Sequence, residues 1–404
     1  MRRALALSIF LLDPAAPATA RAALPLGPAS LQESRTAKTL APGVRFTRIV
    51  RGGRGGGPWR VYVLEIDRAR LSGHVGAVLA RDRLRSLERP SSMARRRHAI
   101  AGVNGGYFAT GAPDLGDPVG VLAIGGQLLS EPVGNRTALL VPRSPAERVS
   151  VAPLRFRGTV TVHGQRRIVD GVDRLRGRIP ACGGLGGDRP TELPNPFVTC
   201  TDASELVVLD RRFGARTGTS RSGVEVVVRD GAVTQVRRQP NTAIPADGYV
   251  LSGTGDAARF LAAAKPGDRP LVDLALHDGS RTVQASDLES ITGGGPRLLR
   301  AGRIDITARA EAQESLGGRN PRTLAGVRAD GRVLLVAIDG RRPGWSAGTT
   351  FRESALVMRS LGARDAMDFD DGGSTAMTVR DRVVNRPSDP GGERAVSDGL
   401  FVLP

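Results

Sequence analysis

Carboxylates and glycines are concentrated near the C-terminal end of the chain, at points where apolar runs stop. The run Val333–Ile338 ends in Asp339-Gly340, and a second short run ends in Asp368, Asp370 and Asp371. The turn Gly372-Gly373-Ser374-Thr375 follows the three acids directly. Acids beside a glycine turn rich in free N–H groups suit the handling of a sugar or a phosphate, which makes an enzyme the first hypothesis.

Three carboxylates are candidates for the reacting group. We rank Asp370 first, because in a strand it shares a face with Asp368 while Phe369 points away. The competing hypothesis is that these acids only bind the amides of their own turn. Asp339 is second, although an Asp-Gly pair after a strand often marks only a turn. Glu353 is third, since it can equally be the capping-box partner of Thr350.

The elements that must position these acids form a strand–helix–strand unit. Residues 333–338 read as a strand buried on both faces, 351–361 as a helix that Gly362 ends, and 366–370 as the next strand. Gly (52 residues) and Pro (27) are abundant, and hydrophobic residues make up 40% of the 404. We therefore predict an α+β fold of mixed β-sheets with packed helices.

Several motifs resemble the phosphodiester glycosidase family, the family with the NAGPA domain. They are Asn104-Gly-Gly-Tyr-Phe108, Asn320-Pro-Arg-Thr323, 336–340, Glu353, 369–377, 384–388 and 392–395. The family includes the lysosomal uncovering enzyme, which removes N-acetylglucosamine from a sugar phosphodiester. The resemblance runs from about Trp59 to Pro404 in one order, and its C-terminal block is the most specific part.

The resemblance implies cleavage of the sugar C1–O bond with release of a phosphate monoester. Such a phosphate has a second pKa of about 6 and can leave without a full proton, unlike an alcohol. Arginine and backbone N–H groups would then stabilise the departing charge. The motifs place Asn104, Arg322, Thr323, Arg394 and the turn Gly372, Gly373, Ser374 and Thr375 at the substrate. For Asn104 the alternative is that it only fixes its turn, and for Arg322 that it is a surface arginine.

The acid-rich turn departs from the family pattern at two positions. Asp371 stands where the family has glycine and Asp368 where it has asparagine, while Asp370 matches the family acid. The extra charge of Asp371 would repel an anionic substrate. Asp368, Asp370 and Asp371 together also suit a Ca²⁺ ion, which takes six to eight oxygen ligands, although their spacing is not that of an EF-hand loop. No cofactor is required by the sequence.

The charge of the chain favours an anionic partner. The formal net charge is +18, and the basic residues are almost all arginine, since only Lys38 and Lys265 are lysines. A coding bias explains this as simply as attraction to phosphate-bearing envelope polymers does. We find no nucleic-acid-binding motif. Two rival functions remain. One is a non-catalytic module that binds polysaccharide or teichoic-type polymer or serves exopolysaccharide biosynthesis, and the other is a phosphodiesterase that breaks P–O instead of C–O.

The N-terminus predicts export from the cytoplasm. Arg2 and Arg3, the apolar stretch 4–12 and Ala18-Thr19-Ala20 have the features of a signal peptide over residues 1–20. We expect a linker over 21–43 and a phosphodiester glycosidase domain over 44–404 with a β-rich insertion at about 149–270. No apolar run is long enough for a membrane span. The protein is therefore expected to be secreted or extracytoplasmic.

The two cysteines, Cys182 and Cys200, enclose a loop rich in Gly and Pro. In an exported protein this arrangement predicts a disulfide, which would contribute on the order of 3 kcal/mol in the chain-entropy model. Two unpaired thiols are the alternative.

A weak internal similarity is also visible. PVGVLAIGGQLL…NRTALLV is similar to GGGPRLLRAGR…NPRTLAGV. A duplicated unit and two unrelated hairpins explain it equally well.

Overall fold

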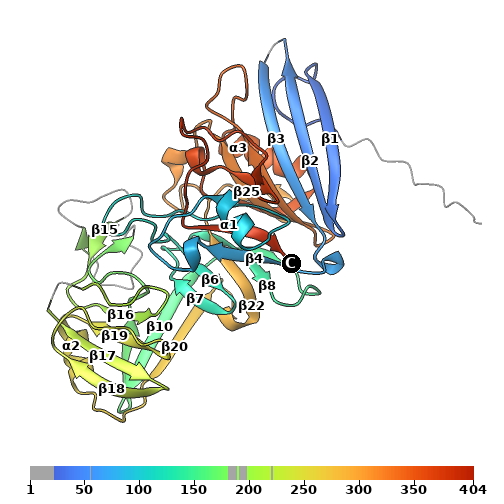
Figure 1. Ribbon diagram of the computed structural model, residues 1–404. Coiled ribbons are helices and arrows are strands. Elements are labelled where there is room, and N and C mark those ends of the chain that lie inside the picture. The colour runs from blue at the N-terminus through green and yellow to red at the C-terminus, as the bar shows by residue number, and fades with distance from the viewer. Residues whose placement is uncertain (1–21, 55, 181–188, 191–197, 220–221) are drawn as a thin grey trace, which may run out of the picture.

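The protein is built mainly from β-sheets, with three α-helices among the residues that the structure describes (Figure 1). This computed structural model describes residues 22–54, 56–180, 189–190, 198–219 and 222–404. The predicted α+β class therefore holds in broad terms, although strands dominate. The predicted signal peptide, residues 1–20, lies outside the described residues.

The largest sheet has eight strands and carries the acid-rich turn at one of its strand ends. Its order is β1 (Gln32–Ala41), β2 (Val44–Gly53), β3 (Gly56–Ile66), β26 (Val333–Ile338), β25 (Arg322–Arg328), β27 (Ala363–Asp368), β23 (Arg297–Arg300) and β24 (Arg303–Ile304). All of these pairings are antiparallel.

The predicted strand–helix–strand unit is confirmed, with one strand inserted into it. β26 and β27 both run antiparallel to β25, so they are parallel to each other and separated by β25. The connection is α3 (Phe351–Ser360), which buries Phe351, Ala355, Val357 and Met358 against this sheet. The continuous apolar run of β26 is explained by burial, since all six of its residues are buried.

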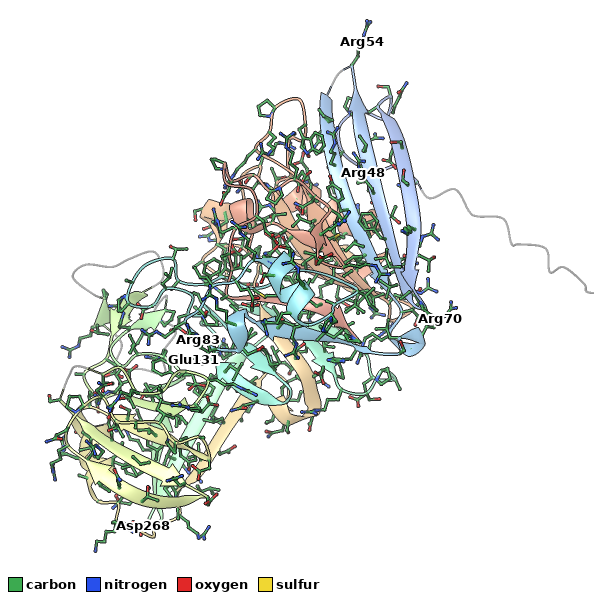
Figure 2. The ribbon with its side chains drawn as sticks, in the orientation of Figure 1. Arg48, Arg54, Arg70, Arg83, Glu131 and Asp268 are labelled. Carbon is green, nitrogen blue, oxygen red and sulfur yellow. The ribbon has the colours of Figure 1, made fainter. Side chains whose placement is uncertain are left out.

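The prediction of a linker over residues 21–43 is wrong for its second half. Gln32–Ala41 forms β1, which pairs with β2 along its length. The strand was missed because its side chains are mostly polar and exposed, as is usual for an edge strand that must not pair with another chain. β1, β2 and β3 project from the body, and Arg48, Arg54 and Arg70 lie along this projection (Figure 2).

Two five-stranded sheets complete the body of the molecule. One has the order β29 (Arg382–Val383), β28 (Met377–Val379), β5 (Ala101–Asn104), β30 (Asp398–Leu403) and β4 (His74–Leu79). The other has the order β7 (Gln127–Ser130), β6 (Leu122–Ile124), β22 (Leu288–Gly293), β8 (Thr137–Pro142) and β9 (Ser150–Pro153). Both contribute to a core shared with the eight-stranded sheet, and α1 (Pro90–Arg96) packs near β5 and β30.

The predicted β-rich insertion forms a separate lobe, with boundaries shifted to about 155–283 (Figure 1). One of its sheets contains β10 (Arg155–Val162), β11 (Gln165–Val169), β20 (Leu271–His277) and β21 (Thr282–Val283). The second contains β12 (Gly171–Val172), β16 (Leu206–Asp210), β17 (Val224–Arg229), β18 (Ala232–Arg237) and β19 (Gly248–Gly253). The third contains β13 (Ile179–Pro180), β14 (Arg189–Pro190) and β15 (Val198–Thr201). Helix α2 (Gly255–Ala262) packs on β17 and β19. The boundary moves because β9 pairs with β8 in the body.

The predicted disulfide stays a prediction. Cys200 is buried in β15, but Cys182 lies outside the described residues.

The two similar sequence segments occupy similar places in two sheets. The orders β7-β6-β22-β8-β9 and β24-β23-β27-β25-β26 correspond strand for strand, and every pairing in both is antiparallel. In each, the Arg-Thr pair stands at the start of the fourth strand, with Arg322 as the first residue of β25 and Arg136 directly before β8. Internal duplication stays a prediction, and this correspondence is compatible with it.

Candidate active site

The acid turn, residues 368–375, begins where β27 leaves the eight-stranded sheet and ends in a short 3₁₀ turn, Gly372–Ser374. The amide of Phe369 donates to the carbonyl of Thr323 at 2.8 Å, and the amide of Asp370 donates to the carbonyl of Gly105 at 3.0 Å. The turn is therefore anchored to β25 of one sheet and to the glycine turn after β5 of the other. This junction brings distant parts of the chain together.

Arg322 forms ion pairs with two of the three acids on the buried side of the turn. Its side chain is fully buried, and Nη1 pairs with Asp368 Oδ2 at 3.0 Å and with the carboxylate of Asp371. The remaining donors bind the carbonyls of Leu316, Gly318 and Thr349. The guanidinium also lies 4.3 Å from the ring centre of Phe351. With all its donors used, Arg322 fixes the turn, and a substrate would have to displace one of these partners to reach it.

The expectation that Asp368 and Asp370 point into one cleft is not met. β27 ends at Asp368, so side chains no longer alternate beyond it, and Asp368 and Asp371 converge on Arg322 instead. The φ of Asp371 is −117°, an ordinary extended value, so aspartate replaces the family glycine without backbone strain. Its carboxylate pairs with Arg322, which it shares with Asp368, and this pairing weakens the expected repulsion of an anion at that point.

Asp370 is the acid of this turn that retains partial contact with solvent. Its Oδ1 accepts from the amide of Asp371 at 2.9 Å, and the side chain of Ser374 also donates to it. Burial raises the pKa of Asp370 to about 7, against the opposing effects of Ser374 and the nearby charge of Arg394. A carboxyl group with this pKa changes protonation state near neutral pH, as a general base or a nucleophile of a hydrolase requires.

Asn104 and Thr323 hold the junction together. Asn104 Oδ1 accepts from Thr323 Oγ1 at 2.7 Å and from the amide of Ala376 at 3.1 Å, while Nδ2 donates to the carbonyl of Asp370 at 2.8 Å. Both side chains are fully buried. This geometry favours the alternative set out for Asn104, that it fixes the turn, and gives Thr323 the same positioning role.

Two arginines flank the acid turn from the solvent side. Arg394 forms hydrogen bonds to Asp389 at 2.8 and 3.0 Å, and its Nη1 lies 3.4 Å from Ser374 Oγ. Its guanidinium covers Gly373, where an added Cβ would stand 2.1 Å from Nη2. Arg341 lies over Gly372 in the same way, 3.0 Å from the corresponding Cβ position, and its Nε donates to Asn320 Oδ1. The glycines thus allow two cations to approach the backbone beside Asp370.

The amides of the turn contribute less than the sequence predicts. The amide of Gly372 donates to the carbonyl of Pro321, that of Ser374 to Asp371, and that of Thr375 to Gly372. Three of the four predicted donors are thus used within the protein. Stabilisation of an oxyanion here would depend mainly on Arg341 and Arg394.

Asp339 is fully buried, and its carboxylate accepts four hydrogen bonds. Its Oδ2 accepts from Tyr62 at 3.1 Å and Trp345 at 2.8 Å, and its Oδ1 from the side chain of Asn385 at 3.1 Å and the amide of Arg386 at 2.9 Å. Burial raises the pKa of Asp339, and these donors oppose that shift. An acid with four donors and no exposure is placed to hold loops together.

Glu353 caps α3. Its Oε2 accepts from the amide of Thr350 at 2.9 Å, and its own amide donates to Thr350 Oγ1 at 3.2 Å. Its Oε1 pairs with Arg319. The capping box is therefore confirmed, and the carboxylate is engaged at both oxygens.

The Ca²⁺ site considered for Asp368, Asp370 and Asp371 is not formed. Within the described part of the chain, no group of three or more acidic, His or Cys side chains is arranged to hold a metal ion. The physical reason is Arg322, which occupies the position between Asp368 and Asp371 that a cation would need.

Sequence reasoning missed Arg341 and Tyr107. Arg341 follows Asp339-Gly340 and adopts a positive φ of 55°, but in so arginine-rich a chain nothing distinguishes it by type. Tyr107 could have been found from the sequence, because it belongs to the Asn-Gly-Gly-Tyr-Phe motif. Its hydroxyl is buried, donates to the carbonyl of Gly295 at 3.1 Å, and lies within electrostatic range of Asp368, Asp370 and Asp371.

Taken together, the junction offers one titrating carboxylate with partial exposure and two cations beside it. Such a set can hydrolyse a bond to an anionic leaving group, because the acid can act on the electrophile while the arginines stabilise the departing charge.

Comparison with known proteins agrees with this chemistry. Residues 222–403 match the phosphodiester glycosidase (NAGPA) family, which confirms the predicted family resemblance over this part of the chain. That stretch includes Arg322, Asp339, the acid turn and Arg394. It starts inside the β-rich lobe and does not include Asn104.

Three individual proteins are similar over different lengths. The crystal structure of a "Putative exported protein" from Burkholderia pseudomallei K96243 has a TM-score of 0.81 at 29% identity, covering 95% of this chain and 98% of that one. A hypothetical protein from Synechocystis shares the fold, with a TM-score of 0.70 at 20% identity over 89% of this chain and 62% of that one. The uncharacterized protein YomE of Bacillus subtilis (strain 168) is 30% identical over 130 residues, which are 32% of this chain and 18% of YomE. The chain thus matches only about a fifth of YomE.

The described residues include no helix with the length and apolar character of a membrane span.

Proposed function

We propose that the protein hydrolyses the C1–O bond of sugar-1-phosphodiesters. The observation that carries this proposal is the position of Asp370, a partly exposed carboxyl group with a pKa of about 7 beside the cations Arg341 and Arg394. The match of residues 222–403 to the phosphodiester glycosidase family supports it.

In the proposed reaction, the oxygen of water is added to C1 of the sugar. The C1–O bond breaks and its electron pair stays on the phosphate oxygen, which leaves as a phosphate monoester. Ionised Asp370 either accepts the proton of the water or attacks C1 first and is displaced by water afterwards. Arg341 and Arg394 stabilise the charge on the leaving phosphate, so a second carboxylic acid is not needed for protonation.

We further propose that the substrate occurs in anionic envelope polymers, either polysaccharide or teichoic-type, and that the protein is secreted. The net charge of +18 favours encounter with such a polyanion. The predicted signal peptide and the similarity to a protein named as exported support an extracytoplasmic location.

The proposal is tested by incubating the purified protein with a panel of sugar-1-phosphodiesters in ¹⁸O-labelled water. We expect free sugar that carries the label, a phosphate monoester that does not, and no product with Asp370→Asn. Label in the phosphate would instead show a phosphodiesterase. Polymer binding without any release of sugar would show a binding module.

A further inference from the structure

The two sheets with corresponding strand order meet at the acid turn. In one sheet, the amide of Phe369 donates to the carbonyl of Thr323 at 2.8 Å; in the other, the amide of Gly294 donates to the carbonyl of Thr137 at 3.1 Å. The strand pairings agree with this, since Leu324 lies opposite Asp368 and Ala138 opposite Gly293. The amide of Gly295 then donates to the carbonyl of Asp368 at 2.8 Å, so the two strand ends are in contact.

This correspondence makes Arg136 the counterpart of Arg322. Arg322 is fully buried and every donor on its guanidinium has a partner. In the second sheet, glycine takes the place of the acid, because Gly293 lies where Asp368 lies in the first. Arg136 therefore has no carboxylate at the position where Asp368 faces Arg322. Among the described residues, none forms an ion pair or a hydrogen bond with its guanidinium, and its Nε is buried without a partner.

The surroundings of Arg136 connect it to the acid turn. The charge of Arg136 interacts with Tyr107 and Glu311, and Tyr107 in turn interacts with the charges of Asp368, Asp370 and Asp371. Glu311 is not free to neutralise Arg136, because its oxygens accept from Thr137 Oγ1 at 2.6 Å, from the amide of Thr137 at 3.0 Å and from Thr307.

A second polar side chain at the same place also lacks a partner. Gln313 is only 2% exposed, yet neither atom of its amide group has a hydrogen-bond partner in the described structure. Both Gln313 and Glu311 approach Gly295, since an added Cβ there would stand 2.7 Å from Gln313 Oε1 and 2.1 Å from Glu311 Oε2. Leaving a half-buried guanidinium and a buried amide unpaired costs stability. Gln313 lies close to Gly295, whose amide binds the carbonyl of Asp368 at the start of the acid turn. The retention of both unpaired groups in this part of the protein is explained if a ligand supplies the missing partners.

We propose that Arg136, assisted by Gln313, binds the anionic oxygens of the phosphodiester group of the substrate. This inference rests on the proposed function and extends it by assigning a residue that distinguishes phosphodiesters from uncharged glycosides. A guanidinium without an internal partner can bind a phosphate through two parallel hydrogen bonds. The saturated Arg322 cannot do so without breaking the acid turn.

The test compares Arg136→Gln with wild type on two substrates of the same sugar, its 1-phosphodiester and its 4-nitrophenyl glycoside. We expect kcat/KM for the phosphodiester to fall about 10- to 100-fold, as loss of a charge-assisted hydrogen bond predicts, while the rate on the uncharged glycoside changes less than about twofold. Arg136→Lys should retain part of the activity. Arg143→Gln is the matched control. Arg136 directly precedes β8 and Arg143 directly follows it, but Arg143 is exposed and donates to the carbonyl of Ser286. An equal loss on both substrates, or none on the phosphodiester, would overturn the inference.

Thermal unfolding and ligand binding separate this inference from the function on which it rests. Removing an unpaired, half-buried charge should leave Tm unchanged or higher, whereas a marked fall in Tm would show that Arg136 serves the fold. Dimethyl phosphate should bind to wild type and not to Arg136→Gln in calorimetry. If wild type releases no sugar but shows this difference in binding, the proposed function fails and the anion site stands. If both proteins release sugar at the same rate, the anion site fails and the function stands.

Discussion

Asp370 and Asp339 are both carboxyl groups near strand ends, yet their surroundings assign them different roles. Asp339 has four donors and no contact with solvent, whereas Asp370 has two donors and partial exposure. The donors of Asp339 come from β3 and from two separate loops. Asp339 is therefore suited to holding these segments in place, and Asp370 to meeting a substrate.

At Asp370 the pKa predicts opposite effects of pH on activity and on stability. Ionised Asp370 is the reactive form, so kcat/KM should rise as pH increases through about 7. The folded state holds this proton more tightly than the unfolded state, whose pKa is about 4. Its contribution to stability is therefore full below pH 4 and is lost as pH rises to about 7.

The corresponding measurement is urea unfolding of wild type and Asp370→Asn at pH 4 and pH 8. The variant should gain stability relative to wild type at pH 8, by on the order of 1–3 kcal/mol, and this advantage should shrink at pH 4. An advantage that is equal at both pH values would mean that Asp370 does not have a raised pKa in the folded protein.

At Asp339, loss of the carboxylate is predicted to affect stability before chemistry. Asp339→Ala leaves Tyr62, Trp345 and Asn385 without an acceptor in a buried place and should cost on the order of 3 kcal/mol in the free energy of unfolding. Asp370→Ala should cost little stability and abolish activity. Chemical denaturation paired with activity per folded molecule measures both. If Asp339→Ala is stable but inactive, Asp339 is catalytic after all.

At the scale of elements, α3 is positioned by its own capping box and by Arg319 in the segment before β25. Glu353 caps the helix and pairs with Arg319, while Phe351 stacks on Arg322. The first turn of α3 thereby supports the arginine that holds Asp368 and Asp371. Arg322 is thus a direct contact between this turn of the helix and the site.

Glu353→Ala is predicted to weaken the helix without removing a catalytic group. The loss of a capping interaction costs about 0.5–2 kcal/mol. Activity per folded molecule should stay within about twofold of wild type. Thr350→Ala is the matched variant, because it removes the other residue of the same capping box. The double variant should lose less free energy of unfolding than the sum of the two single losses. A fall in activity of a hundredfold or more with Glu353→Ala alone would instead place Glu353 in the reaction.

At the scale of the whole molecule, sequence predicted the parts that depend on local pattern. The run Val333–Ile338, the capping box and the group Asp370 to Thr375 could be found because burial, capping and turn chemistry leave local signatures. The ion pairs of Arg322 could not be predicted, because Asp368 and Asp371 follow it by 46 and 49 residues in the sequence and only the folded sheet brings them together. β1 was missed because its exposed polar residues carry no apolar alternation.

The body and the β-rich lobe are joined by a shared core and a buried ion network. One apolar cluster includes Val121 and Leu140 of the body together with Val226 and Leu251 of the lobe. Beside it, Arg174 of the lobe lies between Glu131 of the body, at 2.6 Å, and Glu205 of the lobe. Figure 2 places Glu131 where the lobe meets the body. This arrangement couples the folding of the two parts.

The last prediction is therefore that the protein unfolds in one cooperative transition and that Arg174 contributes to this coupling. Arg174→Met leaves two buried carboxylates without their cation and should cost on the order of 3–5 kcal/mol. Calorimetry should show one transition in wild type, and a lower and broader one in the variant. Arg229→Gln is the control, since it breaks the exposed pair with Asp247 within the lobe and should leave the transition nearly unchanged. Two separate transitions in wild type would show that the shared core does not couple the lobe to the body that carries Asp370.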